Sequence, residues 1–179
     1  MKTAIKTLIA TSLTAIVLTS SAFTTFAKEK APMSITAPVK FNKVVVTGNA
    51  KVVLVQGNKE DITSYNANSE NGTSVTQKGY TLHINSTDNS TVYVYVKDLQ
   101  RIDAANTATV KTRGNFDLAV LQIFLKDEAK ANVNATIGSL YTDLNGTSDL
   151  KLSGSSAEHH LVRNDVSKLN LNDFVIAKL

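Results

Sequence analysis

The C-terminal half of the chain contains a repeat whose segments can be superposed on one another. Each segment has strand-like residues at its two ends, eight positions apart, and small or polar turn-forming residues between them. The segments are Ile102 to Val110, Leu125 to Val133, Leu144 to Leu152 and Arg163 to Leu171, with starts 23, 19 and 19 residues apart. Such a period is typical of stacked coils, each too small to bury its own apolar face. The repeat therefore predicts a β-solenoid with about 19–23 residues per coil.

Strand signals continue upstream of the repeat, and helical signals are nearly absent. Runs of β-branched or aromatic residues, bounded by turn formers, occur at Val44 to Thr47, Val52 to Val55, Tyr80 to Ile84 and Thr91 to Val96. A β-sandwich would also suit strands spaced in this way. A sandwich does not require equivalent positions to return every 19 residues, however, so we favour stacked coils.

The first 27 residues have the features of a secretory signal peptide. Lys2 and Lys6 supply a positive start, an apolar stretch follows, and Thr25-Phe26-Ala27 fits a small-residue cleavage site. Threonine and serine interrupt the apolar stretch, which falls short of the roughly 20 apolar residues that a membrane-spanning helix needs. We expect three regions, with no membrane span left after cleavage: a signal peptide (1–27), a flexible lead-in (28–38) and one β-solenoid domain (39–179).

Charge and cysteine content narrow the classes of partner and site. The formal net charge of +4 falls to +2 when Lys2 and Lys6 leave with the signal peptide. No block of lysine and arginine with interleaved aromatic residues remains, so we expect no nucleic-acid partner. The chain has no cysteine, which excludes disulfides and a thiol nucleophile.

Five segments follow one another in an order that matches a known family. They are Phe41 to Gly48, Val52 to Gly57, Gly79 to Ile84, Val92 to Val96 and Leu99 to Ile102. This order resembles the GIN domain, described as a "putative auto-transporter adhesin head domain" and common in exported proteins of Bacteroidetes-type bacteria. The resemblance covers roughly residues 39–179 and implies a right-handed parallel β-helix. Of the family's Ser-Gly turns, only Leu152 to Ser156 keeps the pattern clearly.

The distribution of acidic residues and histidines argues against a catalytic or metal site. Enzymes that cleave acidic polysaccharides need several carboxylates gathered on one face. Here the acids are scattered, and Glu158-His159-His160 is the one histidine-rich spot. Adjacent residues of an extended segment point to opposite faces, so these two histidines cannot easily ligate one ion. We therefore expect no catalytic residue, no metal and no cofactor.

The segment from Thr91 to Val96 is the best candidate for a binding surface. Its alternation places Val92, Val94 and Val96 on one face and the aromatic rings of Tyr93 and Tyr95 on the other, about 7 Å apart. Tyrosine offers a rigid amphipathic contact surface for a sugar or a protein partner. The alternative, that the two tyrosines cover a neighbouring strand or loop, stays open.

The chain ends in an apolar strand, Asp173 to Leu179, without an evident polar cap. An open sheet edge tends to pair with another chain. Two explanations are open: end-to-end self-association through Phe174, Val175 and Ile176, or a final coil that folds back over the core.

Taken together, the residues and the resemblance predict a non-catalytic exported binding or structural module at the bacterial cell envelope, periplasmic or extracellular. Its partner would be a glycan or another envelope protein. Two alternatives remain: a polysaccharide-active β-helix enzyme, and a periplasmic regulatory domain that binds another envelope protein. A groove with three or more convergent acids would favour the enzyme, and a flat face rich in asparagine and threonine would favour binding.

Overall fold

A computed structural model of the chain describes residues 33–35, 40–65 and 72–177. All regular secondary structure in these residues is β-strand. The predicted signal peptide, residues 1–27, lies outside the described residues. The predicted lead-in, residues 28–38, does so too, except for the short strand β1 (Met33–Ile35).

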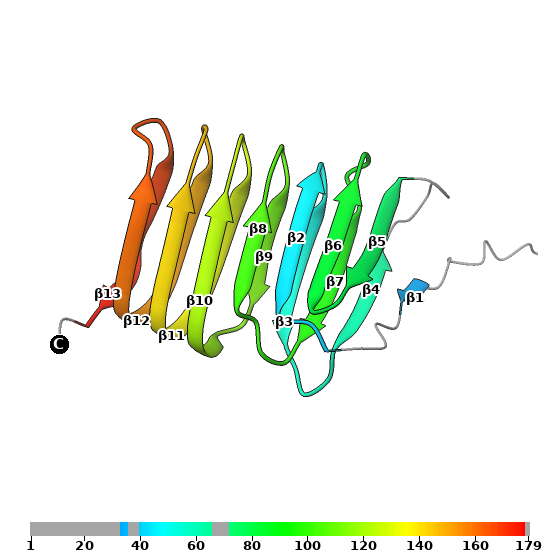
Figure 1. The fold of residues 1–179 in the computed structure, drawn as a ribbon, viewed down its shortest axis with the longest axis horizontal. Coiled ribbons are helices and arrows are strands. Elements are labelled where there is room, and N and C mark those ends of the chain that lie inside the picture. Colours follow the sequence, from blue (N-terminus) through cyan, green and yellow to red (C-terminus); the bar gives the residue numbers. More distant parts are fainter. Residues whose placement is uncertain (1–32, 36–39, 66–71, 178–179) are drawn as a thin grey trace, which may run out of the picture. The chain divides into compact units, whose positions relative to one another are not determined.

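Thirteen strands in this part of the chain join into one sheet (Figure 1). Apart from Tyr80, which precedes β6, the predicted runs fall within four of them, because alternating apolar and polar residues suit a strand with one buried face. After β1 the strands are β2 (Lys43–Gly48), β3 (Lys51–Gln56), β4 (Asp61–Tyr65), β5 (Thr73–Lys78), β6 (Thr81–Ser86), β7 (Thr91–Val96), β8 (Arg101–Ala104), β9 (Thr109–Arg113), β10 (Phe116–Leu125), β11 (Lys130–Leu144), β12 (Asp149–Arg163) and β13 (Lys168–Ile176).

The sheet curls, so that its two arms face each other across the core. Its order is β1-β4-β7-β3-β9-β11-β10-β8-β2-β6-β5, with β12 paired to β11 and β13 paired to β12. We call β5, β6, β2, β8 and the C-terminal parts of β10, β11 and β12 (residues 120–125, 139–144 and 158–163) the first arm. The second arm consists of β1, β4, β7, β3, β9, β13 and the N-terminal parts of β10, β11 and β12 (residues 116–118, 130–137 and 149–156).

The prediction of a right-handed parallel β-helix with about 19–23 residues per coil is wrong, because the sheet is mixed. The pairs β1–β4, β4–β7 and β5–β6 are antiparallel. Only Gly79 and Tyr80 connect β5 to β6, and so short a connection permits a hairpin but no parallel crossover. The strands are also not stacked in chain order, since β2 lies between β6 and β8.

The predicted repeat is therefore not a repeat of equivalent coils along the chain. Some of its positions do meet, since Leu125 pairs with Leu144 and Val133 with Leu152. Ile102, however, pairs with Ile123 instead of Leu125. The repeat thus places the first segment two residues out of register. On a strand, a shift of two residues keeps each side chain on the same face of the sheet but changes the residue that it pairs with.

Turns and bends carry the chain from one arm to the other. Tight turns at residues 105–108, 126–129, 145–148 and 164–167 lead from the first arm to the second. Asn106 and Asp127 adopt positive φ angles of 61° and 59° in two of these turns. The backbone N–H of Asn106 donates to the Asp127 carboxylate over 2.9 Å, which links successive turns.

The core lies between the arms and consists almost entirely of aliphatic side chains from alternate strand positions. Ile102, Ile123 and Leu125 are fully buried. Burial of each such side chain stabilises the fold by about 1.5–3 kcal/mol. No helix that could cross a membrane occurs within residues 33–35, 40–65 and 72–177.

Candidate binding site

The outward face of the first arm brings polar, charged and aromatic side chains together from five neighbouring strands. Across the strand pairs, Lys43 lies opposite Arg101, and Arg101 lies opposite Gln122. Gln122 in turn lies opposite Tyr141, and Tyr141 opposite His160. Because residues directly opposite one another on adjacent strands are about 5 Å apart, these side chains form a continuous row.

Asp103 is held between two cations at the centre of this face. The Nζ atom of Lys43 lies 2.9 Å from one carboxylate oxygen, and Nε of Arg101 lies 2.6 Å from the other. The Asp103 side chain is 22% exposed, so the ion pairs are partly shielded from water. The two contacts fix the position of the carboxylate and compensate its charge.

An aromatic ladder continues from Arg101 across the same face. The guanidinium carbon of Arg101 lies 4.0 Å from the ring centre of Phe124. The rings of Phe124 and Tyr141 are 5.5 Å apart, and those of Tyr141 and His160 are stacked at 5.2 Å. Since the rings cover one another along the sheet, the ladder stabilises the arm but leaves little ring face for a ligand.

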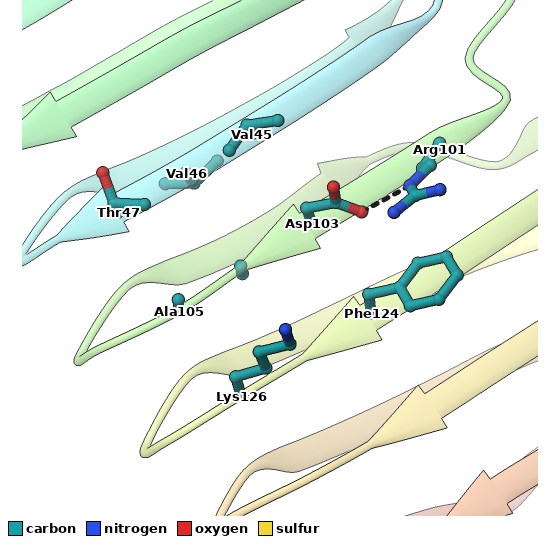
Figure 2. Close-up of a pocket in the computed structure, with 9 residues that line it drawn as sticks. Val45, Val46, Thr47, Arg101, Asp103, Ala105, Phe124 and Lys126 are labelled. Atoms are coloured by element: carbon teal, nitrogen blue, oxygen red, sulfur yellow. Dashed lines mark hydrogen bonds and ion pairs between the residues drawn. The ribbon is translucent and has the colours of Figure 1, made fainter.

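A hollow of about 190 Å³ lies beside the ladder (Figure 2). At the end of β8 the lining consists of two small residues, Ala104 and Ala105. The neighbouring strands carry larger side chains at this level, since Ala104 pairs with Val46 and Leu125. The backbone N–H of Ala105 donates to Val46, and that of Lys126 donates to Ala104, so three strand ends meet here. The lining residues are Val45, Val46, Thr47, Arg101, Asp103, Ala104, Ala105, Phe124 and Lys126.

The hollow combines an apolar floor with a few polar groups at its rim. Val45 and Ala105 supply apolar surface, and the Lys126 ammonium can donate to an anionic or hydroxylated ligand. The Thr47 hydroxyl donates to Oδ1 of Asn85 over 3.2 Å and keeps lone pairs that can accept a bond. A small hydroxylated ligand suits this combination.

Glu158-His159-His160 does not form one cluster, because its two histidines lie on opposite faces of β12. His160 stacks on Tyr141 outside the sheet. His159 lies on the inner side, where its Nε2 is 2.9 Å from the Thr142 hydroxyl. Burial lowers the pKa of His159, and the charge of His160 lowers it further. The described part of the chain contains no group of three or more acidic or histidine side chains that could hold a metal ion.

Tyr93 and Tyr95, the predicted binding residues, lie on β7 in the second arm, away from the hollow. Val92, Val94 and Val96 are fully buried, so the predicted alternation of faces is confirmed. The guanidinium carbon of Arg113 lies 5.6 Å from the ring centre of Tyr93. Both tyrosines are half-buried, and a binding role for them remains a prediction.

The residues predicted for self-association differ in exposure at the C-terminal end of the sheet. Phe174 is buried, with its ring edge-on to His159 at 6.3 Å. Val175 and Ile176 are 65% and 41% exposed, and therefore available to a second chain. Lys178 and Leu179, the last residues of the predicted terminal strand, lie outside the described residues.

No local sequence signal marks the residues around the hollow. Lys43 on β2 and Arg101 on β8 are 58 positions apart, and Lys126 lies in the turn after β10. Only the correct strand register would have placed them together, and the register predicted from the repeat was displaced by two residues. Asp103 is one of the scattered acids, and its two cationic neighbours cannot be inferred from the sequence alone.

Comparisons with known proteins agree with this architecture. A family model described as "Putative auto-transporter adhesin, head GIN domain" matches residues 33–179. No curated protein matches the chain.

Solved structures of similar fold come from species of Bacteroides and Parabacteroides. A putative adhesin from Bacteroides fragilis NCTC 9343 superposes with a TM-score of 0.66 at 18% identity, covering 81% of this chain and 72% of that one. A putative adhesin from Parabacteroides merdae ATCC 43184 gives 0.58 at 14% identity, covering 82% and 74%. A "Putative lipid binding protein" from Parabacteroides distasonis ATCC 8503 gives 0.56 at 8% identity, covering 81% and 75%. At these identities the likeness concerns the fold alone.

Proposed function

Since the chain belongs to the head GIN domain family over residues 33–179, we propose that it is an adhesin-like, non-catalytic binding module exported to the bacterial cell envelope. Its ligand would be a small hydroxylated group carrying an acid, such as an acidic sugar residue of a glycan. The hollow on the first arm would hold this group.

The observation that carries the proposal is the set of fixed polar groups around an apolar floor. Lys43 and Arg101 hold the Asp103 carboxylate in place at 2.9 and 2.6 Å. Lys126 adds a further cation to the lining of the hollow. A site whose donors are already positioned loses less entropy when the ligand binds.

The size of the hollow helps to choose between a sugar and a lipid. Pockets that enclose most of a drug-sized ligand measure roughly 300–1,000 Å³. A hollow of about 190 Å³ on the sheet surface is smaller and suits one ring better than an acyl chain. We therefore prefer a glycan, although one structural neighbour is named a lipid binding protein.

Binding to a glycan array followed by calorimetry on the purified chain tests the proposal. Ala105→Leu should fill the hollow and reduce affinity at least about tenfold, because the ligand would have to give up its floor contacts. Lys126→Gln should lower the affinity for acidic glycans by about tenfold or more, because a charge-assisted hydrogen bond is lost. The affinity for neutral glycans should change little. Lys97→Gln, an exposed change in the β7–β8 loop, is the control. Equal affinities for all four proteins would overturn the proposal.

Partner-protein binding at Tyr93 and Tyr95 is the second candidate. It is favoured by the contact of Arg113 with the Tyr93 ring, since arginine and tyrosine are enriched in protein interfaces. Cross-linking in envelope fractions should then yield an adduct that Tyr95→Ala abolishes and Ala105→Leu preserves. An adduct formed equally well by both variants would argue against this surface.

Export itself can be tested separately. We expect the chain to be found in the periplasm or outside the cell, with Lys28 as its first residue after cleavage of the signal peptide. Cell fractionation and N-terminal sequencing of the recovered protein check this. Recovery from the cytoplasm with residues 1–27 intact would contradict it.

A further inference from the structure

The outward face of the second arm carries one exposed lysine on each of five successive strands of the sheet. β3 pairs with β9, β9 with β11, β11 with β12 and β12 with β13. All five ammonium groups belong to exposed residues. We call this set the lysine track; it consists of Lys51, Lys111, Lys130, Lys151 and Lys168.

The strand register arranges the track as a zigzag between two adjacent rows. Lys51 and Lys130 both lie opposite Thr109, and Lys130 and Lys168 both lie opposite Asp149, so these three share one row. The second row lies two residues further along the strands, on the same face. It holds Lys111 and Lys151, which both lie opposite Asn132.

Strand spacing sets the charge density of the track. Neighbouring strands lie about 4.8 Å apart, so the track presents one positive charge per step of about 4.8 Å. Four such steps span about 19 Å, and the two rows are separated by only about 7 Å. The track is therefore long and narrow, as a surface for a chain-like ligand would be.

The surroundings of the track leave its charge mostly uncompensated. Asp149 lies within one row, and Asp173 approaches Lys151 at 3.5 Å, with both side chains largely exposed. Exposed pairs of this kind contribute little and are screened by salt. Arg113 adds a further cation on β9, beside Tyr93. On the first arm, by contrast, Lys43 and Arg101 are both engaged by Asp103.

We infer that the lysine track binds a linear polyanion, such as an acidic polysaccharide, laid across the strands from β3 to β13. Regular positive charge in a narrow row complements regular negative charge along a polymer. A membrane surface fits less well, because stable attachment needs apolar insertion beside the basic residues. Lysines that served only solubility would not need to alternate between two adjacent rows on successive strands. The proposal concerns a different face from the hollow and does not depend on it.

Binding of the purified full chain to polygalacturonate, a linear polymer of acidic sugars, tests the inference. Affinity should fall at least about tenfold between 50 and 200 mM salt, as expected when several lysines neutralise a polyanion. Lys111→Glu with Lys151→Glu should weaken binding at least about tenfold at the lower salt. The matched control is Lys40→Glu with Lys78→Glu, which changes the net charge equally at exposed positions outside the track. It should change affinity less than about twofold. Thermal unfolding of each variant establishes that it is folded.

Several results would overturn the inference. If both double variants lose affinity equally, the effect depends on net charge and not on the lysine track. If the chain binds neutral dextran equally well, charge does not drive binding. Binding to vesicles containing phosphatidylserine, with none to polygalacturonate, would indicate a membrane surface instead. Loss of polygalacturonate binding in Ala105→Leu alone would place the polymer in the hollow. If Ala105→Leu weakens binding of the small glycan and leaves polygalacturonate binding unchanged, the hollow and the lysine track are independent sites.

Discussion

Thr142 and His159 lie side by side on the inner side of the first arm, with the Thr142 hydroxyl 2.9 Å from Nε2 of His159. Thr142 is fully buried, and the Phe174 ring packs edge-on against the imidazole. Burial lowers the pKa of His159 from its ordinary value of 6.5, and His160 contributes in the same direction. The folded chain therefore favours the neutral imidazole at this position.

The lowered pKa of His159 predicts that acid destabilises the fold. Below pH 6.5 the unfolded chain takes up a proton that the folded chain still excludes. The free energy of unfolding should therefore fall as the pH drops from 6.5 towards the lower pKa of the folded state. Urea unfolding at pH 7.5 and 5.5 measures the loss. His159→Gln should reduce it, whereas His160→Gln, on the outer face, should reduce it less.

Gly154 predicts a strong asymmetry between two glycine substitutions. Its φ is +101°, and an added Cβ would overlap the carbonyl oxygen of Ala135 on the neighbouring strand. Gly79 also has a positive φ, of +57°, but open space surrounds it. Gly154→Ala should cost roughly 3 kcal/mol or more, from strain and clash together, and Gly79→Ala roughly 1 kcal/mol. Chemical denaturation of both variants checks the difference, and equal costs would mean that the backbone relaxes at Gly154.

The core predicts a second contrast, between two apolar positions on β10. Ile123 is fully buried, whereas Val120, three residues earlier, is 46% exposed. Ile123→Ala should lower the free energy of unfolding by about 2–5 kcal/mol, because it leaves a cavity between the arms. Val120→Ala should change it by less than about 1 kcal/mol. Thermal unfolding of both variants distinguishes them, and a loss at Val120 comparable to that at Ile123 would contradict the assignment of inner and outer faces.

Local sequence chemistry predicted the strands and the turns well. The alternation in Thr91 to Val96 identified the buried face of β7, because period-two burial is a property of a single strand. Asn106 and Asp127 were expected in turns and adopt positive φ there, since short polar side chains tolerate that conformation.

Strand partners could not be predicted in the same way, because pairing depends on distant segments. β2 inserts between β6 and β8, whose sequences give no sign of accepting it. The sequence pattern places Tyr80 in a strand run, whereas Gly79 and Tyr80 form the hairpin turn between β5 and β6, so the pattern does not predict this antiparallel pairing. The hollow depends on the insertion of β2 beside β8, since β2 supplies Thr47 and β8 supplies Asp103.

The last strands of the sheet have an open edge. The C-terminal part of β12, residues 158–163, pairs with β11 on one side, and no other described strand covers its second side. Leu161, Val162 and Ile176 are 38%, 43% and 41% exposed at this end. Unpaired backbone donors beside apolar side chains form a template for another strand. Phe174 is buried, and the self-association predicted through it stays a prediction.

We therefore expect the chain to self-associate through this edge as its concentration rises. Val162→Lys with Ile176→Lys should shift the population towards monomer, because charge on an edge opposes strand pairing. Val120→Lys is the control for Val162→Lys alone, so that each adds one charge; Val120 is 46% exposed but lies on β10, inside the sheet. Sedimentation velocity over a range of concentrations measures the change. A contact of the edge with itself closes at a dimer, whereas a contact with the opposite end of the sheet would continue into filaments. A chain that stays monomeric at every concentration would rule out both arrangements.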